Sequence, residues 1–224
     1  MSKRVLVLVE GQTEERFVKD VLGPTFEAQG LYLLPTILTT SRLKDGTRFK
    51  GGVTSFGRFE SDVRRLLMSP GGALVTTMVD YYGLPSDFPG IGSLPVQGGP
   101  IARVEHVEHA LFCHFGSSPT FVPFLLLHEF EALVFASPTE LLKVIPAPDK
   151  QTEFSSICAE FQTPEDINDR PELAPSKRLK HLFPRYRKTL HGPTTVARIG
   201  LERIREQCPH FNAWMQRLEA FAAS

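Results

Sequence analysis

The chain has 224 residues and a mass of 25.0 kDa, which is enough for one domain, or for one domain with an appendage. Lys+Arg and Asp+Glu number 25 each, and the resulting net charge of zero argues against a molecule-wide attraction to nucleic acids or membranes. The three cysteines, Cys113, Cys158 and Cys208, form no CxxC pair, which argues against a zinc knuckle or a dithiol redox site.

The N-terminal residues begin like a signal peptide but the resemblance stops early. Lys3 and Arg4 precede an apolar run over residues 5–9, which ends at Glu10. The apolar part of a signal peptide needs roughly 7–15 residues, and a membrane span needs about 18–20. We therefore expect a cytoplasmic protein without a membrane partner.

Four segments within residues 1–137 have the composition of strands. Residues 5–9 and 73–80 are rich in β-branched and apolar side chains, which is typical of strands that are covered on both faces of a parallel sheet. The other two predicted strands cover residues 31–39 and 121–127. The pattern predicts an α/β core with a mostly parallel central sheet flanked by helices.

Helical spacing of apolar side chains predicts helices between these strands. Gly23-Pro24 is expected to end the first of them. Residues 41–59 are polar and Gly-rich and are interpreted as an excursion beside the site, and residues 82–100 as a long functional loop. The predicted helices cover residues 14–22, 59–68 and 102–115, and another starts within residues 132–135.

The character of the chain changes after residue 137. Strand-like runs vanish, and short helices separated by prolines are predicted over residues 139–144, 153–161, 176–182, 194–207 and 212–222. We therefore expect a core over residues 1–137 and a helical C-terminal appendage over residues 138–224 that packs on the core.

Acidic side chains follow three of the predicted strands. Glu10 ends the first strand and Glu14 lies one turn into the next helix, Asp80 ends the third strand, and Glu129 and Glu131 follow the fourth. Ligands of open parallel sheets bind at the carboxyl ends of the strands, so these carboxylates are expected to converge. They are the oxygen ligands that Mg²⁺ or Mn²⁺ prefers, and the sequence predicts a divalent-metal site.

Each of these acids also has a purely structural interpretation. Glu14 can complement the dipole of a helix start, and Asp80 can cap a turn. Glu129 and Glu131 share a face on a strand but diverge on a helix, so one of them is expected to be structural or to face solvent.

The run Val9-Glu10-Gly11-Gln12-Thr13-Glu14 resembles the first motif of the Toprim fold, and its second Glu resembles the nucleases of the OLD (overcoming-lysogenisation-defect) family. Asp80 stands where a Toprim DxD motif begins, and residues 127–132 resemble a later acidic motif of those nucleases. The full length is also similar to a Toprim-like bacterial family of unknown function, through residues 79–85, 127–133, 175–179 and 186–193. The resemblance implies a Toprim-like, Rossmann-like core.

The sequence departs from the DxD motif at its second acid. Tyr82 stands where the motif has Asp, and Asp87, farther along the loop, is the candidate replacement. The departure bears on a full two-metal mechanism more than on the fold.

Roles follow if the chemistry is phosphodiester hydrolysis. Glu10 is expected to bind metal or act as general base, Glu14, Asp80 and Glu131 to bind metal, and Glu129 to be an alternate ligand. The resemblance implies a late lysine, Lys188 or Lys177, that stabilises charge on phosphate. His191 is a candidate proton shuttle or phosphate ligand.

A basic cluster that includes these two lysines can be a solvated surface or a phosphate-facing patch. It consists of Lys177, Arg178, Lys180, Arg185, Arg187 and Lys188.

Three functional hypotheses remain open. The first is a metal-dependent Toprim-type nuclease acting on nucleic acid. Because the chain has no GxxxxGK[ST] phosphate loop, the resemblance implies a separately encoded ABC-type ATPase partner, in phage defence. The others are a non-catalytic Toprim-like binding subunit and a small-molecule phosphohydrolase.

Overall fold

A computed structural model of the chain describes residues 3–39, 53–167 and 171–224. Its strands pair in parallel throughout, in the order β2-β1-β3-β4, with β5 pairing to β3 beyond the end of β4. This confirms the predicted α/β class with a parallel sheet flanked by helices. The strands are Lys3–Val9 (β1), Leu31–Ile37 (β2), Leu74–Asp80 (β3), Phe121–Val122 (β4) and Leu125–Leu126 (β5).

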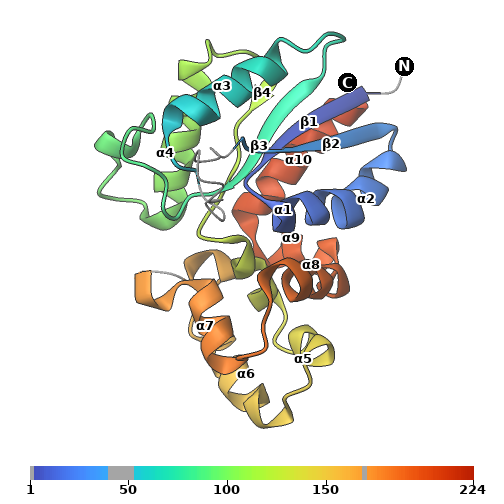
Figure 1. Cartoon of the computed structure of the whole chain (residues 1–224), viewed down its shortest axis with the longest axis vertical. Helices are drawn as coiled ribbons and strands as arrows, with labels where there is room; N and C mark the ends of the chain where they lie inside the picture. Colours follow the sequence, from blue (N-terminus) through green and yellow to red (C-terminus); the bar gives the residue numbers. More distant parts are fainter. Residues whose placement is uncertain (1–2, 40–52, 168–170) are drawn as a thin grey trace, which may run out of the picture.

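Helices cover both faces of this sheet (Figure 1). The α-helices before residue 137 are Gln12–Phe17 (α1), Gly23–Glu27 (α2), Phe56–Leu67 (α3) and Gly99–His114 (α4). Those after it are Glu140–Val144 (α5), Gln151–Ala159 (α6), Pro175–Leu182 (α7), Lys188–Ile199 (α8), Leu201–Gln207 (α9) and Pro209–Ala223 (α10). No helix among the described residues is both long and apolar enough to cross a membrane.

Strand periodicity divides the core into two hydrophobic clusters. Alternate residues of β1 point to opposite faces, so that Val7 joins the cluster under α1, α2 and α10, whereas Leu8 joins the cluster under α3 and α4. Both side chains are fully buried. The central strands β1 and β3 thus form a buried middle layer, as their apolar runs predict, whereas Tyr32 and Leu34 on the edge strand β2 are exposed.

The last helix returns to the sheet. Trp214 Nε1 donates a 2.9 Å hydrogen bond to Thr76 Oγ1 on β3, and Lys3 Nζ donates a 2.8 Å bond to the carbonyl of Phe221. Figure 1 shows α10 alongside the strands, with α5, α6 and α7 grouped below the sheet. Side chains before and after residue 137 therefore share one hydrophobic cluster.

Helix boundaries differ from the predictions most clearly at α2 and α8. The first helical region does not end at Gly23-Pro24, because a π-helical turn over Val18–Leu22 leads into α2. Pro24 lies in the first turn of α2, where a missing N–H costs little. The predicted helix over residues 194–207 begins at Lys188 instead and is divided at Gly200, whose φ of 82° is incompatible with a continuous helix.

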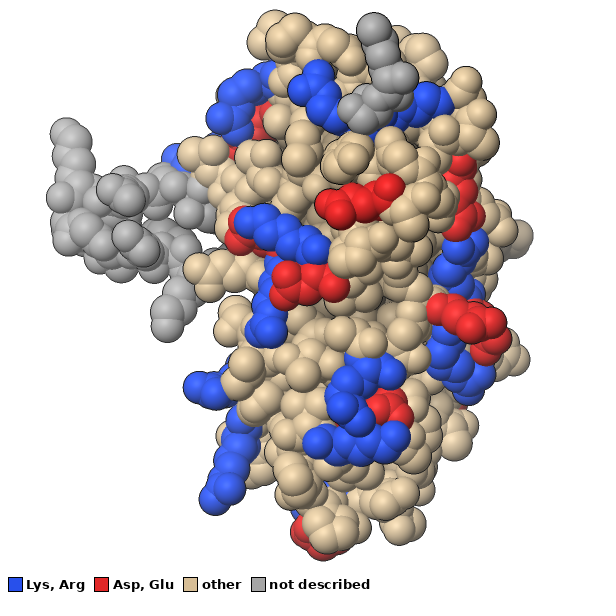
Figure 2. Space-filling view, turned by 90° about the vertical axis from the view of Figure 1, so that its right-hand side faces the viewer, with Lys and Arg blue, Asp and Glu red and all other residues tan. Residues whose placement is uncertain are grey.

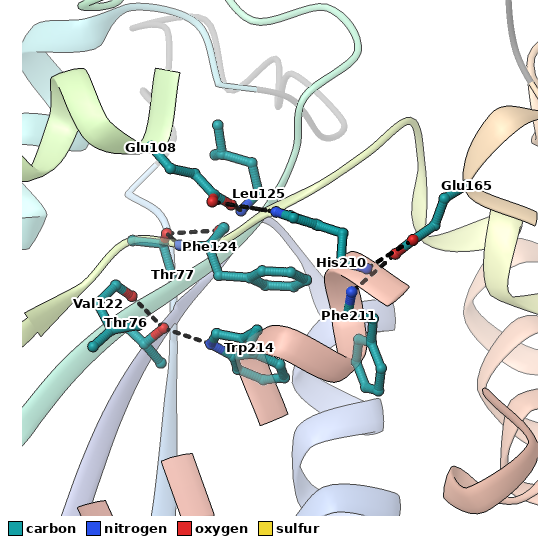
Figure 3. A network of polar contacts seen from close by, with 10 residues as sticks. All are labelled: Thr76, Thr77, Glu108, Val122, Phe124, Leu125, Glu165, His210, Phe211 and Trp214. Carbon is teal, nitrogen blue, oxygen red and sulfur yellow. Dashed lines mark hydrogen bonds and ion pairs between the residues drawn. The ribbon is translucent and has the colours of Figure 1, made fainter. Parts of the chain in front are cut away.

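The fourth predicted strand is interrupted. Pro123, which has no N–H to donate, separates β4 from β5. Thr77 Oγ1 on β3 takes over the pairing there, because it donates to the carbonyl of Phe124 at 2.8 Å and accepts from its N–H at 2.9 Å (Figure 3). The chain then leaves the sheet and forms a 3-10 helix over Phe130–Ala136, where a helix was expected to start within residues 132–135.

The predicted excursion over residues 41–59 lies outside the described residues up to residue 52. The prediction is wrong for the last residues of this segment, because α3 already begins at Phe56. Asp87 Oδ2 accepts a 3.1 Å hydrogen bond from the backbone N–H of Phe56 and so stabilises the start of that helix.

Candidate active site at the carboxyl edge of the sheet

Glu10 and Asp80 meet where β1 and β3 end. The parallel register pairs Val9 with Met78, which places Glu10, the residue after β1, beside the last residues of β3. The backbone N–H of Asp80 donates a 3.0 Å hydrogen bond to Glu10 Oε2. The Glu10 carboxylate is therefore oriented by the neighbouring strand.

Glu131 joins this pair from the 3-10 helix that follows β5. The N–H of Phe130 donates a 3.1 Å hydrogen bond to Asp80 Oδ1, which fixes the start of that helix at the end of β3. The side chain of Glu131 is fully buried, and its Oε1 accepts a 3.4 Å hydrogen bond from Tyr186 Oη. The tight turn after β5 thus delivers a third carboxylate.

Lys188 lies among these carboxylates. Its Nζ is 3.1 Å from Glu131 Oε2 and 3.6 Å from Asp80 Oδ2. Burial lowers the pKa of Lys188, but the charges of Asp80 and Glu131 outweigh burial and raise it overall. Because Lys188 is the first residue of α8, the positive end of that helix also faces the cluster.

Burial raises the pKa of every carboxyl group in this cluster. It brings the pKa of Glu14 to about 7, against the opposing charge of Lys188. It also raises the pKa of Glu10, Asp80 and Glu131, and for Asp80 the neighbouring charge of Glu10 adds to the rise. Lys188 thus offsets only part of the negative charge, and an added cation would lower these pKa values.

The donor chemistry of the cluster fits a hard divalent cation. Its donors are carboxylate oxygens, and Glu131 Oε2 is buried without a hydrogen-bond donor of suitable geometry, although the ammonium of Lys188 is near. As the side chains stand, no three His, Cys, Asp or Glu residues within the described ranges are arranged to hold a metal ion. A metal ion held by these carboxylates would therefore require side-chain movement.

Glu129 has a different role from Glu131. Its two oxygens accept hydrogen bonds from Ser176 N at 2.8 Å and from Ser176 Oγ at 3.0 Å, at the first turn of α7. Glu129 therefore anchors α7, whereas Glu131 points into the cluster.

The remaining candidates lie around the cluster. Lys177 is exposed on α7. His191 is one turn into α8, where its Nδ1 accepts a 3.0 Å hydrogen bond from the N–H of Arg187; burial and the charge of Arg187 lower its pKa. Tyr82 is 37% exposed, and Asp87 is engaged at the start of α3.

Tyr186 is a site residue that the sequence analysis did not identify as such. It is buried, donates to Glu131, and lies against Gly192, where an added Cβ would come within 3.0 Å of its hydroxyl oxygen. Tyr186 lies within residues 186–193, one of the segments that are similar to the family of unknown function. That similarity could have identified Tyr186 as a candidate.

The chain matches a family described as a domain of unknown function (DUF4276) over residues 9–219. It belongs to this family. The match begins one residue before Glu10 and continues through α8 and most of α10, so the DUF4276 domain contains both the strand-end carboxylates and the lysine that faces them. No curated protein and no solved structure matches the chain.

Proposed function

We propose that this DUF4276 protein is a divalent-metal-dependent phosphoryl-transfer enzyme, a Toprim-type nuclease that cleaves phosphodiesters. The observation that carries the proposal is the convergence of Glu10, Asp80 and Glu131 on Lys188 at the carboxyl edge of a parallel sheet. Burial raises the pKa values of these acids, and acids with raised pKa values cluster at binding and catalytic sites, which supports the proposal.

Metal binding is assigned to Asp80, Glu131 and Glu14, with Glu10 as a further ligand or as general base. Bound Mg²⁺ or Mn²⁺ would supply charge neutralisation on the phosphate oxygens. Glu10, with a pKa raised by burial, suits a base that accepts the proton of the attacking water while the phosphorus–oxygen bond to the leaving sugar oxygen breaks.

Lys188 is the favoured phosphate-facing cation. It is partly exposed and lies at the start of α8, so it can turn from the carboxylates toward a phosphate group when a metal ion is bound. Lys177 lies on α7, the helix that Glu129 anchors. It is a secondary candidate for contacts with the phosphate backbone of a nucleic acid.

Substrate contacts must come from a local patch. Figure 2 shows Lys and Arg side chains interspersed with Asp and Glu over the face that it presents, in keeping with the balanced composition. Within the basic cluster, Arg178 serves packing, because its guanidinium lies over the ring of Phe161 and donates to the carbonyl of Leu173. The exposed members, among them Lys180 and Arg187, are the candidate phosphate contacts.

A separately encoded ABC-type ATPase is the proposed partner, with phage defence as the setting. This part rests on the resemblance of residues 9–14 and 127–132 to OLD nucleases.

The test is cleavage of plasmid DNA with Mg²⁺ or Mn²⁺ by the purified protein. Glu10→Gln should abolish cleavage and retain the fold, whereas Glu15→Gln, on the exposed ion pair with Lys19, should not affect it. Equal cleavage by the Glu10→Gln variant would contradict the assignment. Faster turnover of a small phosphodiester than of DNA would favour the phosphohydrolase hypothesis instead.

A non-catalytic binding subunit is the second candidate. It is favoured by Tyr82 at the second DxD position and by the ion pairs through which Lys188 already compensates Asp80 and Glu131. Calorimetric titration separates the two, because a non-catalytic module of this kind should show no Mg²⁺ or Mn²⁺ binding that depends on Glu131.

A further inference from the structure

A buried polar network joins α4, α10 and the segment that leads to Glu131. Glu108 of α4 and His210 of α10 form its centre, with His210 Nε2 at 3.1 and 3.2 Å from the two carboxylate oxygens of Glu108. Figure 3 shows this pair joining two helices across the segment that carries Leu125. Glu108 and His210 are 8% and 6% exposed, so their contacts are made away from water.

Glu108 also holds the backbone of the strand that leads to the site. Its Oε1 accepts a 2.8 Å hydrogen bond from the N–H of Leu125, just after Pro123 interrupts the sheet. A buried N–H without a partner is costly, so this carboxylate fixes the point at which the strand resumes. Leu125 is the first residue of the segment over residues 125–131, which ends at Glu131.

Glu165 links the middle of this segment, at His128, to α10. Its two carboxylate oxygens accept hydrogen bonds from the N–H groups of His210 and Phe211, each at 2.9 Å, and thereby cap that helix. Its backbone carbonyl accepts a 2.8 Å hydrogen bond from Nε2 of His128. The network thus holds both Leu125 and His128, which precede Glu131 in the chain.

We infer that Glu108 and His210 are positioning residues, which use the docked C-terminal helix to fix residues 125–131 so that Glu131 points at Lys188. The inference deepens the proposed function, on which the catalytic consequence rests. The stacking of Phe124 between His210, at 5.1 Å, and Trp214, at 4.5 Å, supports the same connection through apolar contacts.

The test compares three variants by amide hydrogen exchange of the peptide that spans residues 121–131. His210→Phe keeps a ring on Phe124 but leaves Glu108 without its partner, and should accelerate exchange in this peptide at least about tenfold. Glu108→Gln keeps an acceptor for the N–H of Leu125 and should accelerate it less. Arg205→Gln, which removes the ion pair between α9 and Glu219 of α10, is the matched control for general loosening of α10.

Kinetics then give a second readout. If the nuclease assignment holds, His210→Phe should lower kcat about tenfold with little change in KM, because Glu131 is displaced but the substrate contacts remain. Equal exchange in the His210→Phe and Arg205→Gln variants, or unaltered exchange at residues 121–131 in His210→Phe, would overturn the positioning role. A wild-type protein without cleavage would instead count against the proposed function, and the exchange result would still stand.

Discussion

The backbone N–H of Asp80 donates a 3.0 Å hydrogen bond to Glu10 Oε2, and this bond joins the ends of two adjacent parallel strands. The carboxylate of Asp80 in turn accepts from the N–H of Phe130, which brings in the segment that bears Glu131. Backbone donors thus orient two of the acids before any cation binds, and the site is built on rigid elements of the sheet.

Glu14 should destabilise the protein at neutral pH when no added cation is present. The pKa of Glu14 rises from 4.5 to about 7 on folding. The stability that the protonated carboxyl group contributes is therefore fully present below pH 4.5 and is lost as the pH rises through 7. Glu14→Gln should therefore raise the free energy of unfolding at pH 7.5 by roughly 1–3 kcal/mol, with little gain at pH 4. Urea unfolding at the two pH values measures this difference.

Glu15→Gln is the matched control for that experiment, because Glu15 follows Glu14 but forms an exposed i,i+4 pair with Lys19. Its effect should stay within about 0.5 kcal/mol at both pH values. A stabilisation of the Glu14→Gln variant that is as large at pH 4 as at pH 7.5 would refute the assigned origin of the pKa shift.

Mg²⁺ or Mn²⁺ should stabilise the wild-type protein against heat. A cation at a hundredfold excess over its Kd adds about 2.7 kcal/mol to the free energy of unfolding. Glu131→Gln should abolish the rise in Tm, since its oxygens lie in the cluster, whereas Glu129→Gln should retain it, because Glu129 is engaged by Ser176. Differential scanning fluorimetry with and without EDTA reads this out, and loss of the rise in both variants would argue against separate roles.

Removing Lys188 should cost stability in a pH-dependent way. Its charge lowers the pKa of Glu131 and Glu14, so its contribution is present at high pH and is lost as these groups protonate. Lys188→Met should destabilise the fold by about 1–3 kcal/mol at pH 8, a range reduced for its partial exposure, and by much less at pH 4.

Cleavage should also be lost in the Lys188→Met variant. The control for stability is Lys180→Met, at an exposed position of α7, which should leave the free energy of unfolding unchanged at both pH values. Chemical denaturation across pH 4–8 provides the comparison. Equal destabilisation at every pH would mean that Lys188 contributes by packing alone.

Trp214 should hold α10 on the sheet mainly through apolar contact. Trp214→Phe removes the hydrogen bond to Thr76 but keeps a ring beside Phe124, and should cost about 1 kcal/mol. Trp214→Ala leaves a cavity as well and should cost roughly 3–5 kcal/mol. Guanidinium titration measures both, and equal costs would indicate that the hydrogen bond dominates.

The strand runs and the acids at their ends could be recognised in the sequence. Runs such as residues 5–9 and 73–80 are apolar enough to be strands with both faces covered, and parallel pairing brings their carboxyl ends to one edge. Glu10 and Asp80 could therefore be expected at the same edge of the sheet, because each strand is recognised from its own local composition.

Tertiary structure decided which of the other polar residues belong to the site. Glu129 and Glu131 are two residues apart and chemically alike, and only the 3-10 turn after β5 sends one to Ser176 and the other to Lys188. The interruption at Pro123 and the return of α10 to the sheet likewise depend on partners far along the chain, among them Thr77 and Thr76. Local propensity does not encode such contacts, because their free energy is gained only when distant segments pack together.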